Sequence, residues 1–404
     1  MRICYDEGMK NIVICGAGPA GCMAAISAKT HYPLSNVILI DQNEHILKKL
    51  RLSGGGRCNV SANVSVQTII EQTPRNGRFL FASLNEFNST QIQDFFKSRG
   101  CPLVEEDHQR LFPKSHKAID IAQVIQNELN ALNVVMLMNT YVHQIDLQNN
   151  TMITSNETLS FDHLILASGG LSYPQTGSDG YLLSEISKHV FVEKCYPAET
   201  PLVSNDAIIQ SKLLQGVSLK DVSLTLLIDG KKKKQVKHDM LFTHFGFSGP
   251  GVLQLSSVCR DCFEKKQSIS MIIDCLPHLN HQKVESLIKE QTLSKVLSMH
   301  QLPKRLNEAY DVLKENTTPT QFLKSWTFNI HDMRGFNQAF VTSGGISVKA
   351  IDPATMRLKT YPNVSVCGEM IDVHSHTGGY NITIAMSMGY HAGKHCLQAS
   401  KKER

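Results

Sequence analysis

A glycine-rich turn near the N-terminus carries the clearest chemical signal of this 404-residue chain. Gly16-Ala17-Gly18-Pro19-Ala20-Gly21 fits the pattern G-x-G-x-x-G. In this pattern the first glycine permits a tight turn, the second lets the backbone approach a pyrophosphate, and the third lets a helix lie close to a strand. The free N–H groups and the dipole at the start of that helix favour a phosphate. The chemistry expected here is dinucleotide binding.

The segments around this turn have the order that such a site requires. An apolar run, residues 12–15, precedes the turn, and a helical segment of small residues, 22–28, follows it. A second apolar run, 37–40, ends at Asp41, at the spacing expected for a carboxylate that hydrogen-bonds a ribose. The alternative is a fortuitous glycine-rich turn between a strand and a helix, but the complete order favours the dinucleotide site.

A second glycine-rich segment, Ser53-Gly54-Gly55-Gly56-Arg57-Cys58-Asn59, follows the nucleotide-binding unit. Three consecutive glycines argue against a packed strand or helix, and they predict an irregular loop whose N–H groups can line an anion or a flat ring. A flexible surface loop is the alternative. The position directly after the nucleotide-binding unit favours a ligand site.

The remaining pattern predicts an α/β domain interrupted by an insertion. Residues 88–100 and 118–132 have helical spacing, and the apolar strand 161–167 runs into Ser168-Gly169-Gly170, as a strand does at the ligand-binding edge of an open sheet. After residue 195 the pattern changes, and Asp229-Gly230 indicates a hairpin. We therefore expect three segments: 1–195, the first part of the nucleotide-binding domain; 196–340, an inserted domain that is β-rich in 196–250 and 327–340 and helical in 251–326; and 341–404, the second part of the nucleotide-binding domain.

The composition is that of a globular protein, with 42% hydrophobic and 19% charged residues. No apolar run is long enough to span a bilayer, and the first ten residues lack the apolar segment of a signal peptide, so a cytoplasmic location without membrane partners is expected. The net charge is +5, with no basic stripe that interleaves aromatics, so a nucleic-acid partner is not expected. The eleven cysteines are expected to be reduced thiols.

Several segments together resemble the BaiN-type flavoproteins, which include the aminoacetone-oxidase-like NAD(P)/FAD-dependent oxidoreductases. The resemblance rests on the following segments: 16–21, 53–59, 242–250, 342–345, 368–369 and 378–381. It spans nearly the whole chain, and the Gly-Gly-Arg-Cys-Asn loop is far more specific than the dinucleotide pattern. The resemblance implies FAD and a glutathione-reductase-like FAD-binding domain, Rossmann-like and three-layered, split by an inserted β-barrel plus helical domain.

The resemblance also implies which residues would contact FAD. Those expected at the adenosine and pyrophosphate end are Gly16, Gly18, Pro19, Ala20, Gly21, Asp41, Gln42 and Val142. Those expected on the flavin side of the glycine loop are Arg51, Ser53, Gly54, Gly55, Arg57, Cys58 and Asn59. Those expected along the rest of the cofactor are Ala167, Ser168, Gly169, Gly368, Glu369, Gly379, Tyr380 and Asn381. Many related enzymes have Asp at the position of Glu369.

Few catalytic side chains are expected, because a flavin carries out the electron transfer itself. The candidates are Arg57 and Asn59, as polar anchors for a flavin edge or a substrate, and Tyr380, as a proton donor. For Tyr380, as for Tyr173, packing is the alternative. The start of the last helix, near Gly379, would stabilise a reduced, anionic flavin through its dipole.

The histidines and cysteines that could bind a metal or form a redox pair are not expected to do so. His374 and His376 lie on one face if their segment is a strand, but no further ligand is evident, so no metal is expected and a substrate contact is favoured. Cys259 and Cys262 are interpreted as inert helical cysteines rather than a redox pair. For Cys58 a reactive and an inert role both remain open.

The function predicted is that of an FAD-dependent oxidoreductase on a small organic substrate, with NAD(P)H as a transient reductant or O2 as the redox partner. The alternative is a flavin-bound redox sensor, or a protein that binds nucleic acid or another partner through the insert. The Lys231–Lys234 run is interpreted as a solvated strand edge that blocks pairing, with a phosphate grip as the alternative. The sequence leaves the substrate and the oligomeric state open.

Overall fold

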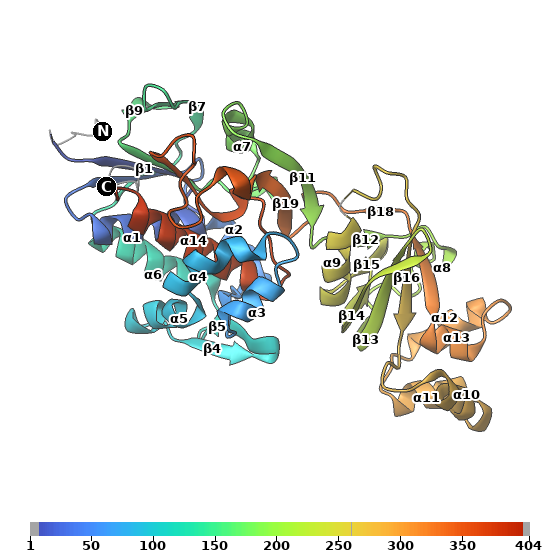
Figure 1. Cartoon of the computed structure of the whole chain (residues 1–404). Coiled ribbons are helices and arrows are strands. Elements are labelled where there is room, and N and C mark those ends of the chain that lie inside the picture. The colour runs from blue at the N-terminus through green and yellow to red at the C-terminus, as the bar shows by residue number, and fades with distance from the viewer. Residues whose placement is uncertain (1–7, 260, 399–404) are drawn as a thin grey trace. The chain divides into compact units, whose positions relative to one another are not determined.

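The computed structural model describes residues 8–259 and 261–398, and it divides the chain into two compact units (Figure 1). The first unit combines the chain up to Cys195 with the chain from Val341 onward, and the second unit is Tyr196–Phe340. Arg260, which lies between Cys259 and Cys262, is outside the described residues. Residues 1–7, most of the segment that was compared with a signal peptide, are also outside them. No helix in the described part of the chain has both the length and the apolar character that crossing a bilayer needs.

A parallel sheet forms the centre of the first unit. Its five strands are ordered β20-β10-β1-β2-β6, and their bounds are Val364–Val366, His163–Leu166, Asn11–Cys15, Asn36–Ile40 and Val135–Leu137. Cys15, the last residue of β1, pairs with Leu166 on one side and with Ile40 on the other. The turns that follow these strands therefore meet at one edge of the sheet, where open α/β sheets bind ligands.

Two further layers cover this sheet (Figure 1). Helices α1 (Pro19–His31), α6 (Ala118–Ala131) and α14 (Tyr380–His395) lie on one face. The antiparallel strands β7 (Val142–Asp146), β8 (Thr151–Thr154) and β9 (Thr158–Ser160) lie over the other, where Met152 Sδ is 3.6 Å from Cys15 Sγ. The predicted fold class, a Rossmann-like three-layer domain, is confirmed. The other helices and strands that lie wholly or partly in this unit are α2 (Lys48–Leu52), β3 (Ser61–Ala62), α3 (Val66–Glu71), α4 (Phe81–Glu86), α5 (Ser89–Ser98), β4 (Leu103–Glu106), β5 (Arg110–Pro113), α7 (Tyr181–Ile186), β11 (Val192–Ala198) and β19 (Val341–Ile346).

Helices α1 and α14 lie in unusually close contact because both carry small residues on the shared face. A Cβ added to Gly389 would lie 2.0 Å from the carbonyl oxygen of Ala20, and one added to Gly393 would lie 2.3 Å from that of Ala24. The Ser27 hydroxyl donates a hydrogen bond to the carbonyl oxygen of Tyr390 at 2.7 Å. This backbone-to-backbone contact fixes the C-terminal segment onto the nucleotide-binding unit.

The second unit contains a sheet of seven strands, ordered β17-β16-β13-β14-β15-β12-β18. Its first and last strands are consecutive parts of one segment, and the N–H of the intervening His331 donates to the carbonyl oxygen of Val203. The sheet therefore curls back on itself like a barrel. The bounds of the unit's elements are β12 (Leu202–Val203), α8 (Ala207–Gln210), β13 (Ser218–Ile228), β14 (Lys231–Phe242), β15 (Gly246–Ser248), α9 (Pro250–Ser256), β16 (Ile269–Asp274), α10 (His281–Glu290), α11 (Leu293–Met299), α12 (Arg305–Leu313), α13 (Pro319–Lys324), β17 (Trp326–Ile330) and β18 (Asp332–Met333).

One expectation for the insert was wrong. The segment 251–326 was expected to be helical throughout, but β16 lies within it and pairs with β13 and β17. Buried and half-buried residues alternate along Ile269–Asp274, which is the period of a strand with one face on the core. The helical character of residues 281–324 obscured this short strand.

The hairpin at Asp229-Gly230 is as predicted. Both residues have positive φ, 50° and 72°, which suits the two-residue turn between β13 and β14. Lys231, Lys232 and Lys233 begin the return strand, β14, with exposed side chains. One edge of β14 pairs with β13, and the other edge pairs with β15 only at Leu241 and Phe242. These lysines therefore lie on an otherwise open strand edge, as the sequence indicated.

Substituting Gly389→Ala tests the contact between α1 and α14. The new methyl group would overlap the carbonyl of Ala20, so we expect the free energy of unfolding of the ligand-free protein to fall by about 2–3 kcal/mol, only partly offset by the better helix propensity of alanine. Urea unfolding measures this change. Gly18→Ala is the matched control, because a Cβ there meets nothing within 4 Å. Equal destabilisation of the two variants would contradict the close helix packing.

Candidate functional site

The glycine-rich turn lies between β1 and α1 at the carboxyl edge of the sheet, and each of its glycines has a distinct environment. A Cβ on Gly16, whose φ is +105°, would lie 2.4 Å from the carbonyl oxygen of Ala167, and a Cβ on Gly21 would lie 1.8 Å from that of Gly16. A Cβ on Gly18 would enter open space. Gly18 is also the N-cap of α1, and no side chain caps that helix. The open N–H groups form a cradle that suits a pyrophosphate.

Asp41 follows β2 beside this turn. Its carboxylate accepts hydrogen bonds from the N–H of Ala17 at 2.6 Å and from the N–H and side-chain amide of Asn43, both at 2.8 Å. The side-chain amide of Gln42 donates to the carbonyl oxygen of Gly177 at 2.8 Å. These bonds join the end of β2 to the glycine-rich turn and to the segment after β10.

A cavity that is partly open to solvent lies at this junction. Five residues predicted to contact FAD line it: Gly16, Asp41, Gln42, Val142 and Ser168. Eight other lining residues were not predicted: Cys15, Ile40, Thr140, Tyr141, Gly177, Asp179, Tyr181 and Leu182. The rings of Tyr141 and Tyr181 are 5.2 Å apart, and such rings suit a flat base. Nothing in the sequence indicates which residues of the segment after β10 face the cavity.

The second glycine loop meets the start of the last helix. Gly54, Gly55 and Gly56 all have positive φ, and a Cβ on Gly55 or Gly56 would meet nothing within 4 Å. With the Asn59 amide assigned so that both its atoms are satisfied, it donates to the carbonyl oxygen of Ser61 and accepts from the N–H of Gly379, each at 3.0 Å. Asn59 therefore connects the glycine loop with the first turn of α14.

Arg51, on α2, carries an unsatisfied polar atom near this loop. Its buried Nε has no hydrogen-bond partner among the described residues. The neighbouring Ser53 hydroxyl donates to the carbonyl oxygen of Leu50 at 2.7 Å. The N–H of Cys58 donates to the carbonyl oxygen of Ser53, and this bond closes the glycine loop. An unpaired guanidinium N–H beside open backbone N–H groups fits an anionic or carbonyl-bearing ligand.

Gly368 and Glu369 tie the C-terminal segment to both glycine-rich regions. The Glu369 carboxylate accepts from the Lys49 ammonium at 2.8 Å and from the N–H of Thr342 at 2.7 Å. A Cβ on Gly368 would lie 2.8 Å from the Cβ of Ala20. Glu369 is thus engaged by protein groups on both carboxylate oxygens, and its longer side chain spans the gap between α2 and β19.

Three further residues predicted to contact FAD, Ala167, Ser168 and Gly169, directly follow β10. The N–H of Ala167 donates to the carbonyl oxygen of Cys15 at 2.8 Å, and the Ser168 hydroxyl lies 3.2 Å from the Met370 sulfur. Gly169 has a φ of +84° and turns the chain away from β10. These residues lie at the carboxyl end of β10, beside the glycine-rich turn.

The candidate catalytic residues differ in how they are held. The Arg57 guanidinium pairs with the Glu106 carboxylate at 2.8 Å and lies 4.3 Å from the centre of the Phe112 ring. Tyr380, the first residue of α14, is half-buried, and burial raises the pKa of its phenol. The phenol is therefore protonated at neutral pH, as a proton donor must be.

The predicted flavin contact Asn381 has a structural role. Its side-chain oxygen accepts from the N–H of Ser375 at 2.8 Å, and its amide group donates to the carbonyl oxygens of Ser375 at 2.8 Å and His376 at 3.2 Å. This side chain fixes the loop that precedes α14.

The cysteines of interest are buried thiols. Burial raises the pKa of Cys58 to about 12 and that of Cys259 also to about 12. Each thiol stays protonated near neutral pH and is a poor nucleophile. This favours the inert interpretation of Cys58, which the sequence had left open.

Comparison with known proteins is consistent with this geometry. The chain is 28% identical over 410 residues to a ribosomal RNA dihydrouridine synthase of Haemophilus influenzae, covering 96% of this chain and 97% of that protein. It is 24% identical over 420 residues to a 3-dehydro-bile acid delta(4,6)-reductase of Clostridium scindens, covering 96% of this chain and 98% of that protein. The open conformation of a flavocytochrome c3 fumarate reductase has a similar fold, with a TM-score of 0.51 at 13% identity, covering 97% of this chain and 79% of the other.

The parallel sheet and the glycine-rich turn define a protein with a Rossmann-type nucleotide-binding domain. Residues 10–395 match the family described as HI0933-like protein Rossmann domain. The chain belongs to this family. The resemblance to BaiN-type flavoproteins, inferred above from the glycine loops, is thereby confirmed.

Gly18→Ala is expected to weaken FAD binding without unfolding the protein. Its methyl group would project into the open space of the phosphate cradle, so the dissociation constant of FAD should rise at least tenfold, about 1.4 kcal/mol. Titrating flavin-free protein into FAD and following flavin fluorescence measures the constant. Gly335→Ala, whose added Cβ also meets nothing within 4 Å, is the control. Unchanged affinity in Gly18→Ala would place the pyrophosphate elsewhere.

Proposed function

We propose that this protein is an FAD-dependent reductase of carbon–carbon double bonds conjugated to a carbonyl group. The names of two relatives point to the same reaction on different molecules. Dihydrouridine is uridine with two hydrogens added across the ring double bond next to a carbonyl. A 3-dehydro bile acid with delta(4,6) double bonds is a conjugated ketone. Both names describe adding a hydride and a proton to an activated double bond.

The substrate we propose is a uracil base in ribosomal RNA. The support is the 28% identity, over nearly the full length of both chains, to a protein named for that activity. Lys231, Lys232 and Lys233 add three exposed ammonium groups at the start of β14, and positive charge suits a phosphate backbone. The net charge alone had not indicated such a substrate.

The observation that carries the proposed reaction is the link between the glycine loop and α14. The Asn59 amide bonds to Gly379, so the first turn of α14, with Tyr380, lies beside the open loop 54–56. Gly18 and the start of α1 would hold the FAD pyrophosphate, and Arg51 would bind a polar edge of the cofactor. Bound FAD would supply the hydride after reduction by NAD(P)H. Tyr380 would deliver the proton from its phenol oxygen.

The substrate assignment predicts dihydrouridine in RNA treated with the enzyme. We expect ribosomal RNA from cells that lack this gene to gain dihydrouridine when incubated with the purified protein, FAD and NADPH or NADH, because its target uridine is still unreduced. Mass spectrometry of the nucleosides measures the product, and RNA from cells that keep the gene is the control. Oxidation of NAD(P)H with a small conjugated ketone, but never with RNA, would contradict the RNA assignment and retain the reaction type.

Tyr380→Phe is expected to slow turnover strongly. Loss of the proton donor should lower kcat about 10²–10⁴-fold while KM and the flavin content change little. Steady-state kinetics on the accepted substrate, with the flavin absorbance as a check on loading, measures both. Tyr173→Phe is the matched control, because Tyr173 lies on a glycine-rich turn but not at the start of α14. A Tyr380→Phe enzyme with unchanged kcat would remove Tyr380 from the mechanism.

A further inference from the structure

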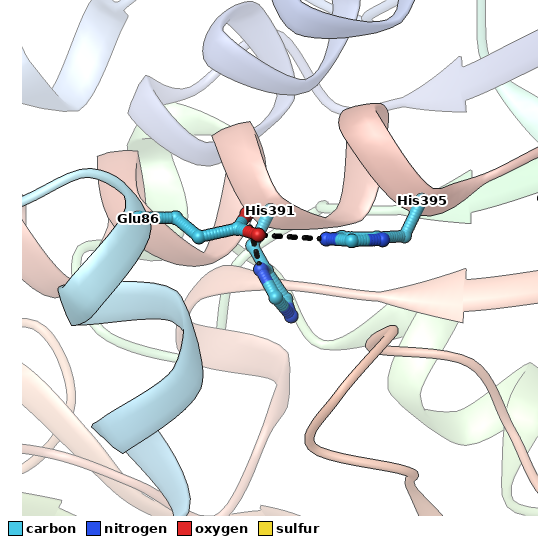
Figure 2. A group of neighbouring side chains, drawn as sticks. All are labelled: Glu86, His391 and His395. Atoms are coloured by element: carbon cyan, nitrogen blue, oxygen red, sulfur yellow. Dashed lines mark hydrogen bonds and ion pairs between the residues drawn. The ribbon is translucent and has the colours of Figure 1, made fainter.

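A cluster of three potential metal ligands lies at the far end of α14 from Tyr380 (Figure 2). Glu86 ends α4, and His391 and His395 lie one turn apart on α14. The Glu86 carboxylate is 2.7 Å from His391 Nδ1 and 3.0 Å from His395 Nε2. One ligand atom from each residue lies within 4.8 Å of the other two. Both rings meet the carboxylate, as Figure 2 shows.

The hydrogen bonds of His395 favour a cation at this point. Its Nδ1 is 2.8 Å from the side-chain oxygen of Gln398, and its Nε2 is 3.0 Å from a Glu86 oxygen. Both oxygens are acceptors, whereas a neutral imidazole has one N–H to donate. A metal ion on Nε2 would use the ring lone pair and leave the Nδ1 proton for Gln398. Metal-bound histidines commonly make such an outer hydrogen bond to an oxygen.

His391 is buried and faces the same carboxylate as His395. The residue is 2% exposed, and its Nε2 has no hydrogen-bond partner among the described residues. Its Nδ1 is the atom that faces Glu86. The cluster therefore presents two imidazole nitrogens and one carboxylate from two helices that already lie in contact.

We propose that Glu86, His391 and His395 bind one divalent cation of the zinc type. Two imidazoles and a carboxylate are ligands that Zn²⁺ accepts, and water would complete a four-coordinate site. The Lys394 ammonium lies 3.2 Å from Glu86 and competes with the cation, but its side chain is 33% exposed and can turn into solvent. The cation would clamp α4 to the end of α14. The sequence alone gave no hint of this group, because Glu86 lies about 300 positions from its partners.

Zinc binding to the full chain tests the proposal. Metal-free, untagged protein should bind one Zn²⁺ per chain in a calorimetric titration, because the three ligands are already assembled. His395→Asn should weaken this affinity at least about tenfold, while His45→Asn, which changes an exposed histidine elsewhere in the same unit, should leave it unchanged. Lys394→Ala should bind Zn²⁺ more tightly than the natural chain, a gain that misfolding cannot produce.

Three results would overturn the proposal: no Zn²⁺ binding by the natural chain, equal binding by the natural chain and His395→Asn, or weaker binding by Lys394→Ala. The last would make the cluster an ion-pair group that includes the lysine. Circular dichroism of each variant separates a lost ligand from a lost fold.

Discussion

The rest of this structure depends on the close backbone contacts that α1 makes with the glycine-rich turn and with α14. Only glycine, which has no Cβ, fits at these contacts. Gly21 lies against the carbonyl of Gly16, and Gly389 and Gly393 lie against the carbonyls of Ala20 and Ala24. A Cβ at any of Gly21, Gly389 and Gly393 would come within 2.3 Å of a backbone oxygen. Because the backbones touch, the start of α1 is held at the carboxyl edge of the sheet, and α14 is held in register with it.

This packing also sets the distance between the N-terminal end of α1 and the N-terminal end of α14. Gly389 contacts Ala20 and Gly393 contacts Ala24, so α1 and α14 run parallel. Helix α14 starts at Tyr380, nine residues before Gly389, which is level with Ala20 in the first turn of α1; this offset is about two and a half turns, or roughly 14 Å. One helix start can therefore receive a pyrophosphate while the other lies further along an extended cofactor. The Asn59 bridge then fixes the glycine loop beside the second helix start.

The sequence predicted those features that depend on local backbone chemistry. The turn at residues 16–21, the acid at Asp41 and the Asp229-Gly230 hairpin each follow from glycine conformation or from short spacing. Features that depend on distant partners were not predictable: Arg57 pairs with Glu106, and the cavity is partly lined by Tyr141 and Tyr181. Strand β16 was missed because its six residues lie between helical segments. The family resemblance supplied the insertion, which periodicity alone only suggested.

The central claim is that this unit holds one FAD along the edge of its parallel sheet, with the pyrophosphate at α1 and the flavin near α14. Identifying the cofactor of the purified protein tests this claim most directly. The account predicts a yellow protein that releases FAD on denaturation, about one molecule per chain by absorbance, with its mass confirmed by spectrometry. A folded protein that is colourless, and that stays so after incubation with excess FAD, would contradict it.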